Sequence, residues 1–288
     1  MAFLISGIKL KLHFLFIVII VAGFAGGLYE EVVAAILALL VHETSHVLAA
    51  RMLGIKVDEL ELLPFGGRIS IKGFYQYSRE GEVMVVLAGP AGNLFLAAVL
   101  ISLTYQGLLP YDKAYLFIRY QLTVGLFNLL PALPLDGGKI FMLWLSQMVS
   151  FIKAVRVAAR MGKGLAFFLW ALFLAMAVKS NYNPVLAVTG IFLFWAANEE
   201  EKQAPLMFMS YMAHKKENLV NKGLLPVQAM VAFVKVPVKH VLYRLNPQSF
   251  YLVYVVDKSC KLKKCLTETE IFDTIIEKGL DIKVEDLL

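Results

Sequence analysis

The feature that most constrains the fold of this chain is a long apolar run, from Val32 to Leu53, that carries ionisable residues near its centre. As a helix, a run of this length can cross the ~30 Å hydrocarbon core of a bilayer. Within it stands the sequence V-H-E-T-S-H, from Val41 to His46. Ionisable side chains are expensive at membrane depth and usually serve a function there. The run therefore predicts a membrane helix with a functional site inside it.

The motif itself has the pattern H-E-x-x-H. On a helix, His42 and His46 are four residues apart and lie on one face, where two imidazoles can bind one zinc ion. Glu43 stands beside them and can act as the general base on the metal's water. Chance matches to this pattern are common across proteins, but the apolar flanks and a third ligand candidate downstream favour a zinc site here.

That third candidate is Asp136, which follows the sequence N-L-L-P-A-L-P-L at the end of the fourth apolar run. Pro131 and Pro134 break the helix and free backbone groups, which is tolerated at membrane depth where the segment lines a protein cavity. An unpaired carboxylate there would be expensive, so a metal partner is expected for Asp136. Because His46 and Asp136 both lie near the same end of their runs, the two side chains can meet.

Composition agrees with a membrane protein. Of the 288 residues, 59% are hydrophobic and 17% are charged, whereas a soluble domain normally carries about 25% charged residues. We predict an α-helical polytopic membrane protein with about six spans. The six apolar runs are Leu12–Leu28, Val32–Leu53, Val83–Tyr105, Tyr115–Leu130, Leu165–Val178 and Pro184–Ala197.

The basic residues are distributed unevenly between the two sides of this arrangement. The net charge of +6 lies mostly in short loops between the apolar runs, so topology and anionic lipid explain it better than nucleic acid, which is not an expected partner. By the positive-inside rule both termini are cytoplasmic. A short interfacial helix is expected at Ile140–Ile152, followed by a basic loop with Lys153, Arg156, Arg160 and Lys163.

Between the second and third runs, the segment Leu60–Lys72 changes to a period of two. Arg68, Ser70 and Lys72 alternate with two isoleucines, and a Pro-Phe-Gly-Gly turn precedes them, which predicts a β-hairpin. A simple connecting loop is the alternative. As a hairpin, its edge would lie over the site and pair with an extended substrate.

The last third of the chain has a soluble composition. We expect a membrane domain at 1–198, a linker helix at 199–222 and a small domain at 223–288, whose pattern predicts strands and helices in the order β-α-β-β-α. Cys260 and Cys265, the only cysteines, are expected to be free thiols in a reducing compartment.

The membrane half resembles the site-2 protease family of intramembrane zinc metalloproteases. The resemblance rests on H-E-T-S-H, on L-P-F-G-G at Leu63–Gly67, on A-G-P-A-G-N at Ala88–Asn93 and on N-L-L-P-A-L-P-L-D-G-G from Asn128. Thr44 and Ser45 depart from the Leu and Gly that are common in the family. The six-span layout and a C-terminal α/β module similar to a single cystathionine-β-synthase (CBS) domain point to the stage IV sporulation protein FB branch.

The resemblance implies one Zn²⁺ per chain, held by His42, His46 and Asp136. It further implies that Glu43 is the catalytic acid/base and that Asn128 helps to stabilise the oxyanion. The implied substrate is a membrane-tethered precursor, a pro-sigma factor during sporulation, in the membrane around the forespore, where membrane proteins would act as inhibitors. A CBS-like domain implies a homo-oligomer and ATP as a candidate ligand.

Two other functions remain open from the residues. A metal transporter also places histidines and acidic groups at membrane depth, although transport requires neither an acid/base beside the first ligand nor a strand-forming hairpin. An inactive membrane sensor with a nucleotide-binding domain would keep the fold without the metal. Zinc uptake or zinc-free purified protein, respectively, would indicate these alternatives.

Overall fold

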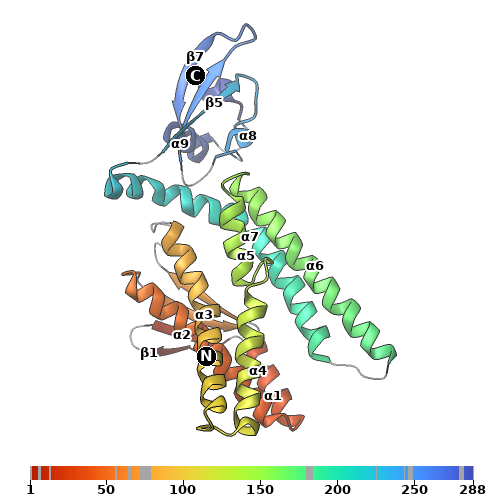
Figure 1. Cartoon of the computed structure of the whole chain (residues 1–288). Coiled ribbons are helices and arrows are strands. Elements are labelled where there is room, and N and C mark those ends of the chain that lie inside the picture. The colour runs from red at the N-terminus through yellow and green to blue at the C-terminus, as the bar shows by residue number, and fades with distance from the viewer. Residues whose placement is uncertain are drawn as a thin grey trace. The chain divides into compact units, whose positions relative to one another are not determined.

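The structure is a computed structural model, and it describes residues 2–5, 8–12, 14–55, 57–63, 66–71, 79–179, 184–224, 226–242, 244–245, 249–278 and 282–287. The chain divides into two compact units (Figure 1). The first comprises Met1–Phe141 and Ala158–Glu200, and the second comprises Met142–Val157 and Glu201–Leu288.

Helices dominate the first unit and continue into the second. They are α1 (Phe14–Ala25), α2 (Tyr29–Met52), α3 (Arg79–Tyr105), α4 (Tyr111–Asn128), α5 (Asp136–Leu145), α6 (Phe151–Val178) and α7 (Pro184–Lys222). A helix is therefore present at each of the six predicted spans.

Three helices among the described residues are both long and apolar enough to cross a membrane. They are Tyr29–Met52, Glu80–Tyr105 and Phe151–Val178. Helix α1 has only 12 residues, and α4 carries Asp112, Lys113 and Arg119 within its 18 residues. The chain is thus mostly helical with several apolar helices, while the count of six spans stays a prediction.

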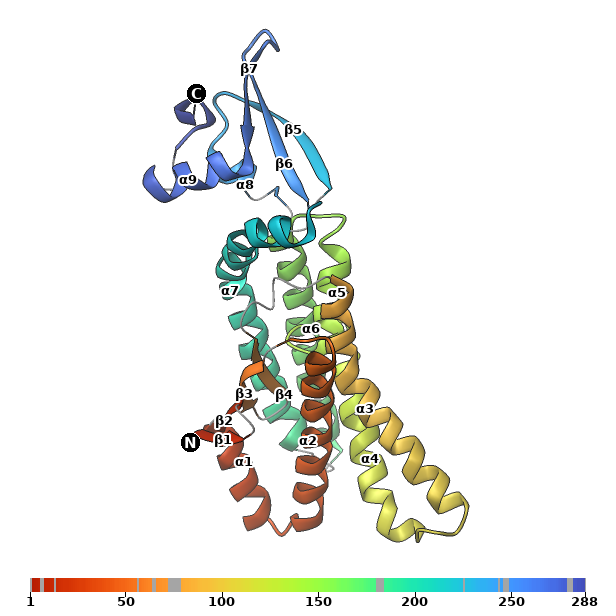
Figure 2. The ribbon, with the colours of Figure 1, turned by 90° about the vertical axis from the view of Figure 1, so that its left-hand side faces the viewer.

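Glycines bring α2, α3 and α4 close together, as expected from the A-G-P-A-G-N motif. Helix α3 packs against both α2 and α4, and Figure 2 shows α3 and α4 joined as a helical hairpin. A Cβ atom added at Gly92 would overlap Ser45 of α2, and one at Gly125 of α4 would press on Asn93 of α3. The absence of these side chains allows the backbones to approach, as in other membrane helix pairs.

The first unit also contains a four-stranded sheet in the order β1-β2-β3-β4. Its strands are β1 (Ala2–Ile5), β2 (Ile8–Leu12), β3 (Val57–Leu63) and β4 (Gly66–Ile71). Strands β3 and β4 pair antiparallel, which confirms the hairpin, although Pro64, Phe65 and Lys72 lie outside the described residues. Strands β1 and β2 were not expected, and β2 runs parallel to β3. Among these strands β4 forms an edge.

The prediction for the segment after Asp136 was wrong in two respects. The first helix there, α5, begins at Asp136 rather than at Ile140. The basic residues do not form a loop but belong to the first half of α6. The reason is an alanine-rich stripe: Ala154, Ala158 and Ala159 are fully buried, so the basic side chains occupy the remaining faces of a continuous helix.

The linker helix expected at 199–222 is likewise not separate. Helix α7 runs without interruption from Pro184 to Lys222 and includes Pro205. The three consecutive glutamates from Glu199 mark a change in composition, but they favour helix formation and do not end the helix.

The C-terminal elements follow the predicted order β-α-β-β-α. They are β5 (Val227–Phe233), α8 (Val238–Leu242), β6 (Phe250–Val256), β7 (Leu262–Thr267) and α9 (Glu268–Lys278), followed by a 3₁₀ helix, η2 (Val284–Leu287). Strand β6 lies between β5, which is parallel to it, and β7, which is antiparallel. The module is therefore a small three-stranded sheet with helices, and its assignment as a CBS domain goes beyond this observation.

Helix α9 begins at a capping box. The Thr267 backbone N–H donates to Glu270 Oε2 at 2.7 Å, and the Glu270 backbone N–H donates to Thr267 Oγ1 at 3.3 Å. These two bonds satisfy backbone donors that the first turn of a helix leaves without partners. The same contacts lower the pKa of the exposed Glu270 carboxyl, first through the Thr267 backbone N–H and then through its hydroxyl.

Candidate metal centre

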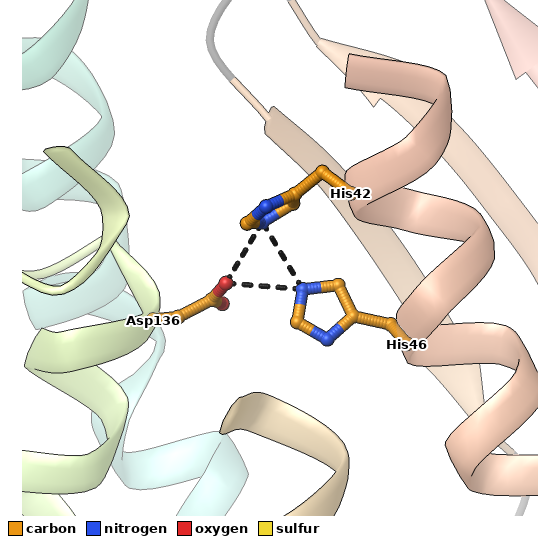
Figure 3. Close-up of side chains that lie close together, drawn as sticks. All are labelled: His42, His46 and Asp136. Atoms are coloured by element: carbon orange, nitrogen blue, oxygen red, sulfur yellow. Dashed lines mark hydrogen bonds and ion pairs between the residues drawn. The ribbon is translucent and has the colours of Figure 1, made fainter. Parts of the chain in front are cut away.

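Helix α2 carries both histidines and the glutamate of the motif on buried positions. His42 and Glu43 are each 2% exposed, and His46 is 5% exposed. The helix is continuous through the motif, so the spacing of four residues places both imidazoles on one face, as predicted. Figure 3 shows the two rings projecting from α2 toward one another.

The connection between α4 and α5 positions the third side chain. Helix α4 ends at Asn128, and the Leu133 backbone N–H donates to the carbonyl of Ala158 on α6, which ties the connecting segment to that helix. A Cβ atom at Gly137 would overlap the backbone of Leu129, so only a glycine allows α5 to start this close to the end of α4. Asp136, the first residue of α5, thereby reaches the histidines.

The three predicted ligands meet in one cluster (Figure 3). The Nε2 atoms of His42 and His46 each lie 3.0 Å from Oδ2 of Asp136, and they lie 3.2 Å from each other. The rings are nearly perpendicular, with their centroids 4.7 Å apart and an interplanar angle of 89°. Asp136 is 4% exposed. The three side chains thus converge in the structure, while their role as zinc ligands stays a prediction.

Hydrogen bonds on the far side of each ring fix the histidine tautomers. Nδ1 of His46 lies 2.7 Å from the carbonyl oxygen of Val85, which can only accept, so Nδ1 carries the proton. Nδ1 of His42 lies 2.7 Å from Oδ1 of Asn93. The amide nitrogen of Asn93 donates to Ala38 O at 2.9 Å, so Oδ1 is the acceptor toward His42. Both Nε2 atoms therefore present lone pairs to the cluster.

This donor set fits a zinc ion. Two imidazole lone pairs and a carboxylate oxygen face each other at 3.0 to 3.2 Å, an arrangement that is repulsive without a cation between them. Tetrahedral zinc with bonds of ~2.0–2.1 Å holds neighbouring ligand atoms about 3.3 Å apart. Two histidines and one carboxylate are also a ligand set of catalytic zinc sites, which keep a fourth position open.

Lys139 holds the other carboxylate oxygen of Asp136. Its ammonium group lies 3.0 Å from Oδ1, one helical turn after the aspartate on α5. Because Oδ1 is paired with Lys139, Oδ2 is the oxygen that faces the imidazoles. Lys139 therefore orients the carboxylate for a single bond to the metal.

Asn128, the predicted oxyanion residue, is buried at the end of α4 and is 6% exposed. Its amide nitrogen donates to the carbonyl of Val124 at 3.0 Å, one turn earlier in the same helix. It also lies near the connection that leads to Asp136. Its role at the oxyanion stays a prediction.

The sequence reasoning missed the residues that orient the ligands. Asn93 stands in the A-G-P-A-G-N motif without a predicted role, although a polar amide in an apolar helix is itself a signal of function. Lys139 follows Asp136 by three residues, which is the spacing of an ion pair on a helix. The carbonyl of Val85 carries no sequence signal, because any residue could supply it.

Comparisons with known proteins agree with this geometry. The profile of Peptidase family M50 matches residues 31–109. A zinc metalloprotease of Methanocaldococcus jannaschii is 29% identical over 210 residues, which cover 69% of this chain and 60% of that protein. Stage IV sporulation protein FB of Bacillus subtilis is 24% identical over 284 residues, which cover 98% of this chain and 96% of that protein.

A solved structure shares the fold over most of the chain. The site-2 protease from Methanocaldococcus jannaschii matches with a TM-score of 0.57 and 27% sequence identity, covering 70% of this chain and 94% of that chain. The matched profile spans α2 and α3, which carry the H-E-x-x-H motif and the residues that orient it. Residues 31–109 thus match Peptidase family M50, and in its motifs, its converging ligands and its fold the chain is similar to zinc metalloproteases of the site-2 protease type.

Proposed function

We propose that this protein is an intramembrane zinc metalloprotease that hydrolyses a peptide bond in a membrane-associated protein. The observation that carries the proposal is the cluster of His42, His46 and Asp136, whose ligand atoms all lie within 4.8 Å of one another next to the buried carboxylate of Glu43. One zinc ion per chain would be held by these three side chains.

A bound zinc ion supplies a Lewis acid that polarises the scissile carbonyl and makes water more acidic at neutral pH. Glu43 accepts the proton of the attacking water and passes it to the leaving amine. Asn128 donates its amide to the carbonyl oxygen as negative charge develops there, a contribution of about 3 kcal/mol for one such donor. Water enters from the cytoplasmic side at the segment 131–138.

Two substitutions test the assignment of the base and the third ligand. Glu43→Gln replaces the buried carboxylate with an amide of the same size and leaves the ligands in place, so zinc content should be unchanged while cleavage is abolished. Asp136→Asn removes a charged ligand, so it should weaken both zinc binding and cleavage. The measurement is co-expression with membrane-tethered precursors, followed by zinc analysis of the purified protein. Full proteolysis by purified Glu43→Gln protein contradicts the proposal.

The same variants separate proteolysis from metal transport. In proteoliposomes, a transporter would take up zinc in a manner that depends on His42 and is indifferent to Glu43. A protein that is purified without zinc and gains no activity on zinc addition would instead be an inactive sensor. Proteolysis, in contrast, should depend on both His42 and Glu43.

The edge strand β4 is proposed to bind the substrate. Strands β3 and β4 pair from Val57↔Ile71 to Leu63↔Gly66, and β4 pairs with no further strand among the described residues. An exposed strand edge offers backbone donors and acceptors to an extended peptide. Since proteases act on extended chains, a helical substrate would unwind and add to this edge before cleavage.

The substrate is proposed to be a pro-sigma factor that is processed during sporulation. The support is the similarity to stage IV sporulation protein FB, which extends over 98% of this chain. In a spore former the protein would lie in the membrane around the forespore, with both termini cytoplasmic, and membrane proteins would inhibit it. Cleavage of a membrane-tethered pro-sigma factor, but not of unrelated membrane proteins, tests this assignment.

The C-terminal module is proposed to be CBS-like and to join copies of the chain. One face of its sheet is covered, with Tyr251, Val253 and Val255 buried and α9 packed against β6 and β7. On the opposite face Val227 and Val231 are 59% and 69% exposed. The residues on this open face, by strand register, are Val227, Ala229, Val231, Phe233, Phe250, Leu252, Tyr254, Val256, Cys265 and Thr267.

This open face carries no charged side chain among those residues, and an exposed apolar sheet face is typical of an interface. Two copies can bury it by packing face to face, as sheets do at about 10 Å separation. Val231→Arg should lower the oligomeric state of the detergent-solubilised chain, measured by light scattering, while Lys235→Glu should not. ATP binding by residues 220–288, or an effect of ATP on cleavage, would support nucleotide regulation.

A further inference from the structure

Two buried amides connect the ligand helix to its neighbours. Asn93 on α3 is 0% exposed, and Gln121 on α4 is 2% exposed. Burying a primary amide among membrane helices is expensive unless its donors and acceptors have partners. Asn93 makes three hydrogen bonds: one with the α2 backbone, one with His42 and one with Gln121.

The backbone carbonyl of Ala38 determines the direction of each hydrogen bond that Asn93 makes. The Ala38 carbonyl can only accept, so it takes one N–H of Asn93 at 2.9 Å. Oε1 of Gln121 takes an N–H of Asn93 at 2.5 Å. An asparagine amide has two N–H donors and one carbonyl oxygen. With both donors directed to these acceptors, only Oδ1 remains for Nδ1 of His42, at 2.7 Å.

A flipped Asn93 amide would place Oδ1 against two acceptors and an N–H against His42. That arrangement would favour the opposite imidazole tautomer, in which Nε2 carries the proton and cannot bind a metal. We propose that Gln121 is a positioning residue that acts through Asn93 to hold His42 as the Nδ1–H tautomer. The proposal rests on the zinc site described above, and it places a residue that positions one of the ligands on a third helix, α4.

The place of Gln121 on α4 connects the amide pair to the segment that carries the third ligand. This helix ends at Asn128 and leads through the following connection to Asp136 on α5. The hydrogen bond from Asn93 to Gln121 therefore ties α4, which leads to the third ligand, to α3. Since α2, α3 and α4 pack against each other, the amide pair fixes their register at the depth of the metal cluster.

The test compares three variants of the full chain by zinc affinity, measured by competition with a chromogenic chelator. Gln121→Met removes the acceptor and should weaken zinc binding about tenfold or more, the range found for residues that orient metal ligands. Gln121→Glu keeps an acceptor oxygen and should bind zinc like the wild type. Ile118→Met is the matched control, because Ile118 is also buried on α4, at 8% exposed, and should leave affinity unchanged.

A second readout separates positioning from packing. The chain has five histidines, so ¹⁵N-histidine labelling of metal-free protein can report the protonated nitrogen of each ring. Gln121→Met should convert His42 from the Nδ1–H form to a mixture, and it should add no further loss of zinc affinity in an Asn93→Leu background. Weaker zinc binding with an unchanged His42 tautomer overturns the inference in favour of packing.

The outcomes also distinguish this inference from the proposed function. If the wild-type protein binds zinc and Gln121→Met binds it equally well, the inference is wrong and the zinc site stands. If the wild-type protein binds no zinc, the proposed function itself is wrong.

Discussion

At the scale of single residues, the site depends as much on a missing side chain as on the side chains present. A Cβ atom at Gly89 of α3 would overlap Nε2 and Cε1 of His46 and press on Cε1 of His42. Gly89→Ala should therefore displace the ligands and destabilise the fold by about 1–3 kcal/mol, as overpacking does. Zinc content and thermal unfolding of the purified variant measure this effect.

The control for this substitution is Gly164→Ala on α6. A Cβ atom at Gly164 would meet no atom within 4 Å, and alanine has the higher helix propensity. This variant should retain zinc and unfold at the same temperature as the wild type or slightly above it. Equal zinc content in both variants would contradict the close packing of α3 against the ligands.

The capping carboxylate of Glu270 gives a pH-dependent prediction at the same scale. The pKa of Glu270 is lower in the folded protein than in the unfolded chain. The stabilising effect of its carboxylate is therefore fully present above the pKa in the unfolded chain, about 4.3. It is lost as the pH falls through the pKa in the folded protein. Hydrogen-exchange protection in α9 should therefore decrease more in the wild type than in Glu270→Gln as the pH is lowered from neutral into this range. A parallel decrease in both proteins would contradict the cap.

Much of the site could be predicted from the sequence, because its ligands have fixed chemical signatures. His42, Glu43 and His46 are set by helical spacing, and Asp136 is set by the high free energy of an unpaired carboxylate at membrane depth. The residues that orient the ligands could not be predicted, because their function depends on which helices pack together. Asn93 acquires its role only where α3 meets α2.

At the scale of elements, the hairpin offers a test that leaves the metal untouched. If β4 receives the substrate as an added strand, a proline at Ile69 or Ile71 removes a backbone N–H from the sheet and distorts the edge. Cleavage should slow while zinc content stays unchanged, as measured on the same purified protein. Loss of zinc in the proline variants would indicate general misfolding instead.

The elements that the sequence predicted well are those with a clear period and clear ends. The sequence predicts a strand at Phe250–Val256 and a helix at Glu268–Lys278, and β6 and α9 have these bounds, because β6 is a continuous apolar run and α9 starts at a capping threonine. The N-terminal strands were missed although I-K-L-K-L at Ile8–Leu12 has a period of two. Lysines directly before an apolar run are also typical of the flank of a membrane span, and the pairing of β2 with β3 is a long-range contact that no local pattern encodes.

At the scale of the whole molecule, the distribution of charge defines an orientation in the membrane. Figure 2 shows the turn after α1 and the connection between α3 and α4 at the same end of the first unit. The connection, residues 106–110, has no charged residue, whereas Arg51 lies in the last turn of α2 at the other end. The positive-inside rule therefore predicts that the end with Arg51 faces the cytoplasm.

The two native cysteines provide a direct test of this orientation. Cys260 is an exposed free thiol in the C-terminal unit and is not part of the proposed oligomer face, so a membrane-impermeant maleimide should label it in lysed spheroplasts and not in sealed ones. In a variant with both cysteines replaced by serine, Leu108→Cys should react in sealed spheroplasts, because Leu108 is 69% exposed in the uncharged connection 106–110, which the positive-inside rule predicts to lie outside the cytoplasm. Labelling of the native cysteines in sealed spheroplasts would place the C-terminal unit outside the cytoplasm. It would then separate that unit from a cytoplasmic precursor and from ATP, and both assignments would have to be abandoned.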